Sequence, residues 1–288
     1  MMATSKPFIA VSGADESVAG ATVWWRLYGD LDRAELLQQL TTHNFAPERC
    51  PDPVDPEKAL RRAVGELGGR RRLIRPIKRG VWAVVEEQVD TTMETLKHWN
   101  GPTVRFDKIG RPVLENATRD EAELVTSAYA RYLDALTTED VGSWLIAQAY
   151  RLGGVALRES GGIYYIPPGR WPEWAGLVGA LQAAHPQHTC YSMPTFKLNA
   201  SGARAILDAI AVEVETEVAK IGDEIISGDL GVRALETRGD RSRALLTKVE
   251  EYEALVGTRL DKLREHLGKL QSDVSAARLA AEALKEGE

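Results

Sequence analysis

The chain has 288 residues, of which 44% are hydrophobic and 27% charged, and its formal net charge is −6 at pH 7. These values are typical of a globular protein with more than one folding unit, and they exclude a chain coated in positive charge. The two cysteines, Cys50 and Cys190, stand far apart, which excludes a disulfide framework and fits a reducing compartment. No apolar run reaches the roughly 18 residues of a membrane span, and the first residues lack the pattern of a signal peptide, so we expect a cytoplasmic protein.

The N-terminal part predicts an α+β region that follows a flexible leader at 1–20. Residues 21–28 are β-branched and aromatic, which predicts a strand, and an aspartate in the segment 29–32 then begins a helix. Four prolines between 47 and 56 predict an irregular link before a short helix at 57–67. Extended segments follow at 73–77, 81–89, 95–99 and 103–106, with turns at 78–80 and 100–102.

Residues 118–152 return to helical periodicity. Thr118 begins a sequence that resembles a capping box, and a second helix restarts at Thr137. The stretch 153–167, GGVALRESGGIYYIP, has two apolar runs around Gly161-Gly162, a pair that supplies the positive φ angles of a tight turn. We expect a β-hairpin there, and after it a helix at 172–184.

The C-terminal part predicts long helices. A helix at 203–227 precedes a longer one at 243–286, whose apolar residues repeat every seven positions over about five heptads. This pattern predicts a coiled coil or a long helical hairpin, and its seam needs a cover, which is the first helix, another copy of the chain or a different protein. We expect self-association or a partner helix through 243–286, with these contact residues: Leu246, Val249, Val256, Leu260, Leu263, Leu267, Leu270 and Val274.

Two consecutive helices followed by a hairpin are the order of elements in a winged helix-turn-helix module. The second helix would then enter the major groove of DNA, and the hairpin would be the wing. Arg151 at the helix end and Arg158 near the hairpin tip would contact phosphate. Trp144 and Ile146 give that helix a broad apolar surface, however, so a scaffold of two helices and a hairpin is the alternative.

The most informative pattern is a basic run at 61–79. It holds eight cations against one acid, Glu66, although the chain as a whole is acidic. Arginine suits phosphate because its planar fork of donors matches the phosphate oxygens. We expect these cations to bind nucleic acid or another polyanion, while a charged strand edge or pairing with carboxylates is the alternative. The residues are Arg61, Arg62, Arg70, Arg71, Arg72, Arg75, Lys78 and Arg79.

No signature of catalysis or metal binding stands out. His185, His188 and Cys190 have the spacing of metal ligands, but a fourth ligand is missing and a polar loop explains them better. A nucleophile elbow, a phosphate-binding loop and a metalloprotease helix are all missing from the sequence. We therefore expect no catalytic residue, no metal and no cofactor. Dispersed nuclease carboxylates would leave no such pattern, so the enzyme question stays open, with "no" as the favoured answer.

The segment 152–167 and the order of the parts around it resemble an uncharacterised family of bacterial, archaeal and viral proteins. Its members share an early strand and helix, an arginine-containing helix after a proline-rich link (here 59–63), a Gly-Gly-hydrophobic-Tyr/Phe-hydrophobic-Pro centre and a helical C-terminus. The similarity spans most of 21–225. It implies no activity, and at most a context of phages or mobile elements.

These patterns predict an α+β fold in four segments. They are a leader at 1–20, an α+β domain with the basic strand at 21–116, a winged-helix-like domain at 117–200 and a helical region at 201–288. The favoured function is a non-enzymatic protein that binds DNA or RNA and oligomerises through its C-terminal helices. The alternative is a structural or adaptor protein of a larger assembly with no nucleic-acid role.

Overall fold

The computed structural model describes residues 19–90, 95–108, 110–159, 161–195, 198–228 and 230–286, with the backbone alone at 88–90, 95–100 and 284–286. Of the leader expected at 1–20, residues 1–18 lie outside the described residues. The chain forms two compact units. The segment expected at 201–288 lies within one of them, whereas the segments expected at 21–116 and 117–200 each have residues in both. The bundle unit comprises Met1–Arg26, Ile146–Gly176 and Cys190–Glu288, and the sheet unit comprises Leu27–Leu145 and Leu177–Thr189. Each combines helices with strands, so the α+β prediction is confirmed.

The sheet unit contains an antiparallel meander with the strand order β3-β4-β5-β6. The expected turn at Lys78–Gly80 joins the first two strands, with a positive φ of 72° at Gly80. The turn expected at 100–102 is wrong, because β5 runs through these residues and a register shift opposite Ala83 and Val85 accommodates them. The strands are β3 (Arg72–Lys78), β4 (Val81–Asp90), β5 (Thr95–Phe106) and β6 (Pro112–Glu115).

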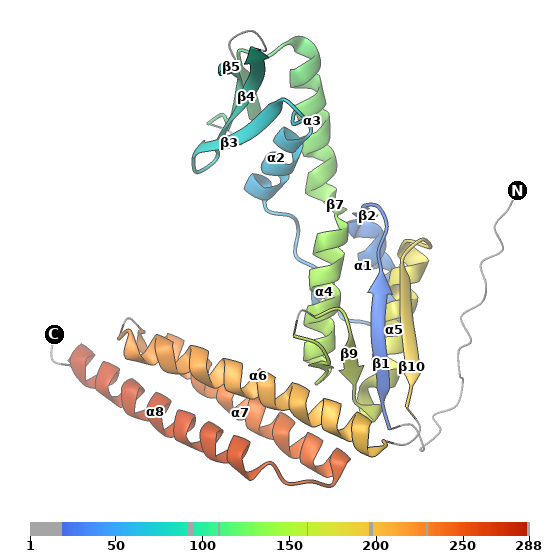
Figure 1. The fold of residues 1–288 in the computed structure, drawn as a ribbon, viewed down its shortest axis with the longest axis vertical. Helices are drawn as coiled ribbons and strands as arrows, with labels where there is room; N and C mark the ends of the chain where they lie inside the picture. Colours follow the sequence, from blue (N-terminus) through green and yellow to red (C-terminus); the bar gives the residue numbers. More distant parts are fainter. Residues whose placement is uncertain are drawn as a thin grey trace, which may run out of the picture. The chain divides into compact units, whose positions relative to one another are not determined.

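Two helices, α2 (Pro56–Gly65) and α3 (Arg119–Asp134), cover one face of this sheet (Figure 1). Thr118 and Glu121 form the expected capping box at the start of α3. Side chains alternate between the two faces of a strand, so every second strand residue turns towards the helices. The buried core between them is apolar and consists of Leu60, Ala63, Val64, Leu67, Trp82, Val84, Val104, Val125 and Ala128.

The other elements of the sheet unit lie before and after this module in the chain. The short strands β2 (Leu31–Asp32) and β7 (Ala135–Leu136) pair with each other. The Asp32 side chain accepts hydrogen bonds from the first N–H groups of α1 (Arg33–Thr42), as the sequence predicts for an aspartate at this helix start. The proline-rich link contains the 3₁₀ helix η1 (Pro47–Arg49). Helices α4 (Thr138–Arg151) and α5 (Trp171–Ala184) contribute residues to both units.

The bundle unit contains a second sheet with the strand order β10-β1-β9-β8. The hairpin expected at 153–167 forms, with Val155 opposite Tyr165, and both Gly161 and Gly162 have positive φ angles. It differs from a free wing, because β9 is an inner strand that pairs with β1 on its other side. The strands are β1 (Ala21–Arg26), β8 (Val155–Ala156), β9 (Tyr164–Ile166) and β10 (Thr189–Pro194), and the 3₁₀ helix η2 (Pro168–Arg170) follows β9.

Three helices complete the bundle unit and pack on one another: α6 (Ala200–Ile226), α7 (Val232–Val256) and α8 (Asp261–Glu286) (Figure 1). The single helix expected at 243–286 is wrong, because the chain turns at Gly257, which takes the left-handed conformation that favours glycine. α7 and α8 therefore form a helical hairpin with each other, whereas the sequence predicts a hairpin between 203–227 and 243–286. None of the helices in the described part of the chain is long and apolar enough to cross a membrane.

The heptad seam is covered within this chain. Val249, Leu263, Leu267, Leu270 and Val274 are buried, and Leu246, Val256 and Leu260 pack against the same core at its edge. Residues of α6, such as Ile210 and Val214, belong to that core. The helices of one chain therefore bury the seam without a second copy. Self-association stays a prediction, but burial of the seam does not require it.

Replacing Leu267 by alanine tests this packing. Leu267 is fully buried in the bundle core, so Leu267→Ala is expected to lower the free energy of unfolding by about 3 kcal/mol. Leu279→Ala on the same helix is the matched control, since that leucine is 66% exposed and its loss is expected to cost less than about 0.5 kcal/mol. Urea unfolding at several protein concentrations measures both, and a midpoint that rises with concentration would show that a second chain covers the seam.

A buried histidine predicts the acid sensitivity of the sheet unit. The Nδ1 atom of His188 accepts a hydrogen bond from the backbone N–H of Tyr28 at 3.1 Å, and the ring stacks on His185. Burial and the neighbouring His185 lower the pKa of His188 to about 4 from its ordinary 6.5. Between pH 4 and pH 6.5, this histidine is therefore protonated in the unfolded chain but not in the folded one. The free energy of unfolding falls as the pH drops from 6.5 to 4.

Thermal unfolding across this pH range is expected to show a loss of about 3 kcal/mol that His188→Gln reduces. His43→Gln is the control, because His43 is exposed and its replacement leaves the loss unchanged. The same pH dependence in His188→Gln as in the wild type would contradict this assignment.

Candidate nucleic-acid interface

The basic run at 61–79 folds into α2, the turn after it and β3. Its eight cations fall into two groups. Carboxylates bind three of them, which are Arg62, Arg72 and Arg79. The other five are exposed and have no acidic partner among the described residues: Arg61, Arg70, Arg71, Arg75 and Lys78.

Arg62 is a structural residue, which corrects its prediction as a phosphate contact. Its guanidinium lies 2.7 Å from Asp140, and Lys58 binds the other carboxylate oxygen at the same distance. Burial by itself raises the pKa of Asp140, but hydrogen bonds from Arg62, Lys58 and Thr137 outweigh it and hold that pKa well below its usual range. The Arg62 side chain is 12% exposed, so little of it is available to a ligand.

Arg72 is also paired with carboxylates. Its guanidinium binds Glu86 on the neighbouring strand and Glu121 in the first turn of α3. Hydrogen bonds from the Thr118 backbone and from Arg72 lower the pKa of Glu121. Arg72 therefore ties the sheet to α3, and its prediction as a phosphate contact is corrected in the same way. Arg79 differs, because it binds Glu57 at 3.2 Å while its side chain stays 92% exposed.

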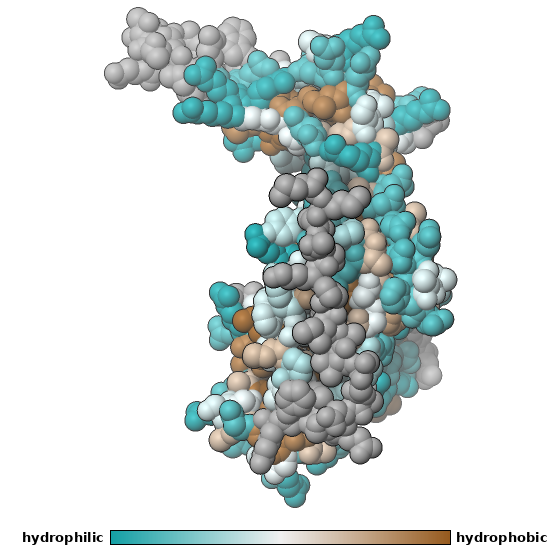
Figure 2. Space-filling view, turned by 90° about the vertical axis from the view of Figure 1, so that its right-hand side faces the viewer, coloured by the Kyte–Doolittle hydropathy of each residue, from teal (hydrophilic) through white to brown (hydrophobic). Residues whose placement is uncertain are grey.

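Four of the five unpaired cations lie in β3 or in the turn that leads into it, and we name them the β3 basic surface: Arg70, Arg71, Arg75 and Lys78. Arg75 and Lys78 belong to the strand, whereas Arg70 and Arg71 occupy the turn that the paired residues Gly69 and Arg72 close. Ile74 packs into the core under the helices, so its neighbour Arg75 points to the opposite face of the sheet. Hydrophilic side chains surround a smaller apolar area over the part of the chain that contains this sheet (Figure 2).

That sheet face carries a further arginine that the sequence did not single out. Arg105 on β5 alternates with the buried Val104, so it shares the face of Arg75. Glu115 on β6 binds its guanidinium at 2.6 Å. No local motif marks Arg105, since only the pairing of β3, β4 and β5 brings it to the same face as β3.

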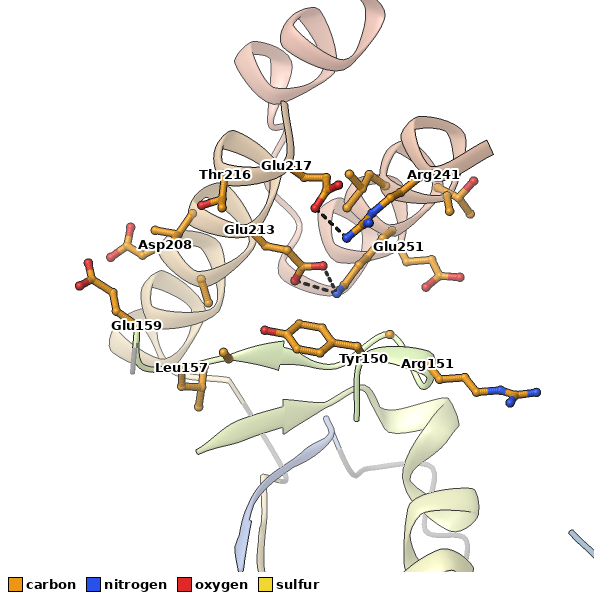
Figure 3. Close-up of a pocket in the computed structure, with 18 of the residues that line it drawn as sticks. Tyr150, Arg151, Leu157, Glu159, Asp208, Glu213, Thr216, Glu217, Arg241 and Glu251 are labelled. Carbon is orange, nitrogen blue, oxygen red and sulfur yellow. Dashed lines mark hydrogen bonds and ion pairs between the residues drawn. The ribbon is translucent and has the colours of Figure 1, made fainter. Parts of the chain in front are cut away.

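Arg151 and Arg158 belong to the bundle unit, where both line one cavity. Figure 3 shows this cavity with Arg151 labelled. The cavity has a volume of 1180 Å³ and lies between the end of α4, the segment after β8, and helices α6 and α7. Arg170 in η2 lines it too, which no sequence pattern indicated. All three arginines are exposed and have no acidic partner among the residues described.

The inner charges of this cavity are paired with one another. Lys248 donates hydrogen bonds to both carboxylate oxygens of Glu213, at 2.7 and 2.8 Å, and to the carbonyl of Gly154 at 2.8 Å. Burial lowers the pKa of Lys248, and the adjacent Glu213 carboxylate opposes that effect. All three protons of the ammonium group are used, so Lys248 joins α7 to α6 and to the hairpin rather than acting as a nucleophile.

The His-x-x-His-x-Cys spacing has a structural explanation. His185 and His188 stack on each other, and His188 uses its Nδ1 atom as an acceptor for the Tyr28 backbone. Burial raises the pKa of the Cys190 thiol to about 12, which keeps it protonated. Among the residues that the structure describes, no group of three or more His, Cys, Asp or Glu side chains is placed to hold a metal ion.

Substitution of two neighbouring arginines on α2 tests the division of the basic run into paired and unpaired cations. Arg62→Ala is expected to lower the free energy of unfolding by about 2 kcal/mol, because it removes a partner of the buried Asp140. Arg61→Ala is the matched control, since Arg61 is exposed and unpaired, and its effect is expected to stay within about 0.5 kcal/mol. Urea unfolding measures both, and equal effects of the two variants would contradict the division.

Comparison with known proteins gives one match. A family model described as a family of unknown function (DUF6744) matches residues 18–285. Comparisons with curated proteins and with solved structures found no match. The expected membership of an uncharacterised family is confirmed, while the Gly-Gly motif as its mark and a phage-related context stay predictions. Because the match covers nearly the whole chain and both units, this protein belongs to the family of unknown function DUF6744.

Proposed function

We propose that this protein associates with nucleic acid without acting as an enzyme, and that the β3 basic surface contacts the phosphates. One observation carries the proposal. Arg70, Arg71, Arg75 and Lys78 are exposed, lie close in sequence in β3 and the turn before it, and have no acidic partner among the described residues, in a chain whose net charge is −6. Where so many carboxylates are present, a row of unpaired cations favours an external anion.

The chemistry of this surface suits a phosphate backbone. An unpaired guanidinium binds phosphate without first giving up an internal ion pair, and arginine does so through two parallel hydrogen bonds. Each contact is individually modest and releases a counterion from the nucleic acid, so affinity grows with the number of contacts and falls with salt. Four exposed cations in one short segment provide several such contacts on one ligand.

The alternative is an adaptor whose cations bind an acidic protein. The pairing of Arg62, Arg72 and Arg79 with carboxylates favours it, because these three show that the same run also serves internal ion pairs. The two functions differ in the ligand and not in the surface. Direct binding of nucleic acid therefore separates them.

The test is binding to labelled DNA and RNA over a salt series, with a variant in which Arg70, Arg71, Arg75 and Lys78 are all alanine. The wild type is expected to bind with a log–log salt slope of roughly −3 to −4 for four contacts to duplex DNA, and the variant is expected to lose most of this affinity. A second variant changes Lys220, Arg233, Lys262 and Lys269 to alanine. It loses the same charge from exposed positions of the bundle helices and is expected to bind like the wild type.

Two results would overturn the proposal. One is an absence of binding at low salt by a wild-type protein whose circular dichroism shows that it is folded. The other is an equal loss of affinity in both variants, which would make net charge the cause rather than the β3 basic surface.

A further inference from the structure

The turn between β3 and β4 presents an apolar residue among its cations. Pro76 lies opposite Trp82 and Lys78 opposite Val81, so Ile77 is an extra residue that no residue of β4 faces. Such a bulge changes the direction of a side chain and increases the local twist. Ile77 is 59% exposed, and Pro76 beside it is exposed as well. We name these two residues the wedge.

Cations stand on both sides of the wedge. Arg75 precedes it, and Lys78 and Arg79 follow it. Arg75 and Lys78 have no acidic partner among the described residues, and the Arg79 side chain is 92% exposed. A single exposed isoleucine is ordinary on a protein surface, but one that three cations flank in the sequence matches a ligand with an apolar interior and an anionic exterior.

The turn is also held in place. The Glu57 carboxylate accepts a hydrogen bond from the backbone N–H of Gly80 at 3.1 Å and from the Arg79 side chain at 3.2 Å. Glu57 is in the first turn of α2, whose start is capped by Asp55. Since α2 is packed on the sheet, the turn is fixed to the body of its unit, and less conformational entropy is lost when a ligand binds.

Double-stranded DNA is the ligand that fits these features. Its stacked bases form an apolar interior between two phosphate backbones, and isoleucine or proline side chains inserted between base steps partly unstack them and kink the duplex. Cations on either side then hold the phosphates that border the opened step. We infer that the wedge enters duplex DNA and bends it, an inference that rests on the proposed binding by the β3 basic surface.

Bending of a labelled duplex tests this inference with the full-length protein. A duplex of about 30 base pairs with a central TA step carries a donor and an acceptor dye at its ends. Wild-type protein is expected to raise the energy transfer, whereas Ile77→Ser is expected to bind with an unchanged salt slope and to lose at least about half of that rise. Ile77→Leu is expected to keep it. Ile226→Ser, which changes an isoleucine that is 84% exposed in the bundle unit, is the matched control and is expected to keep it too.

A second readout uses the cost of unstacking. A duplex with a central mismatch is already partly open, so the wild type is expected to bind it about tenfold more tightly than the matched duplex. Ile77→Ser is expected to reduce this preference to less than about threefold. Exposed Ile77 contributes little to the core, and thermal unfolding verifies that the variant is folded.

The outcomes separate the two proposals. Bending by Ile77→Ser equal to that of the wild type, or binding without bending by the wild type, overturns the wedge and leaves the proposed function in place. Binding to single-stranded DNA or RNA alone has the same meaning. Failure of the wild type to bind any nucleic acid at low salt overturns both. Tight binding of a polyglutamate peptide with no binding of duplex DNA also overturns both and identifies the surface as a site for acidic proteins.

Discussion

Asp140 collects hydrogen bonds from Arg62, Lys58 and Thr137, because a carboxylate that is only 10% exposed stays ionised only with such partners. This carboxylate joins α2 to the start of α4, and α2 in turn covers the sheet that carries the β3 basic surface. The same constraint divides the basic run. Arg62 and Arg72 fold against the body of the sheet unit and meet carboxylates, and the exposed Arg79 binds one as well. The cations of the β3 basic surface do not. The candidate interface is thus the set of cations that the fold itself does not use.

In the bundle unit, too, a buried charge is held by a partner of opposite charge, but there the buried group is a cation. Lys248 is the buried cation there, and Glu213 supplies the opposite charge across the helix pair. The bundle helices also carry the buried hydroxyl of Ser242 and an ion pair between Glu217 and Arg241. Buried polar groups of this kind cost stability unless they are paired, and they favour one register of helices over others. The long apolar seam alone would fit several registers.

Local features were predictable from the sequence because their causes are local. The aspartate cap of α1, the capping box at Thr118 and the glycine turn at 161–162 each depend on neighbours within four residues. The pairing of the arginines was not predictable, since Arg61 and Arg62 are identical neighbours and only the helix face decides which one meets Asp140, 78 positions away. The break at Gly257 was missed because the heptad pattern continues across it. Arg105 and Arg170 join their surfaces through tertiary structure alone.

The position of β1 in its sheet has a consequence for synthesis of the chain. β1 is among the first described residues, yet its partners β9 and β10 come from residues 164–166 and 189–194. The helices and meander at 56–134 need only contacts within their own short segment, and such local contacts form fastest. During translation the sheet unit's core therefore folds while β1 still has an open edge. An open strand edge is a template for pairing with another chain, so the nascent protein is exposed to misassembly until both β9 and β10 leave the ribosome.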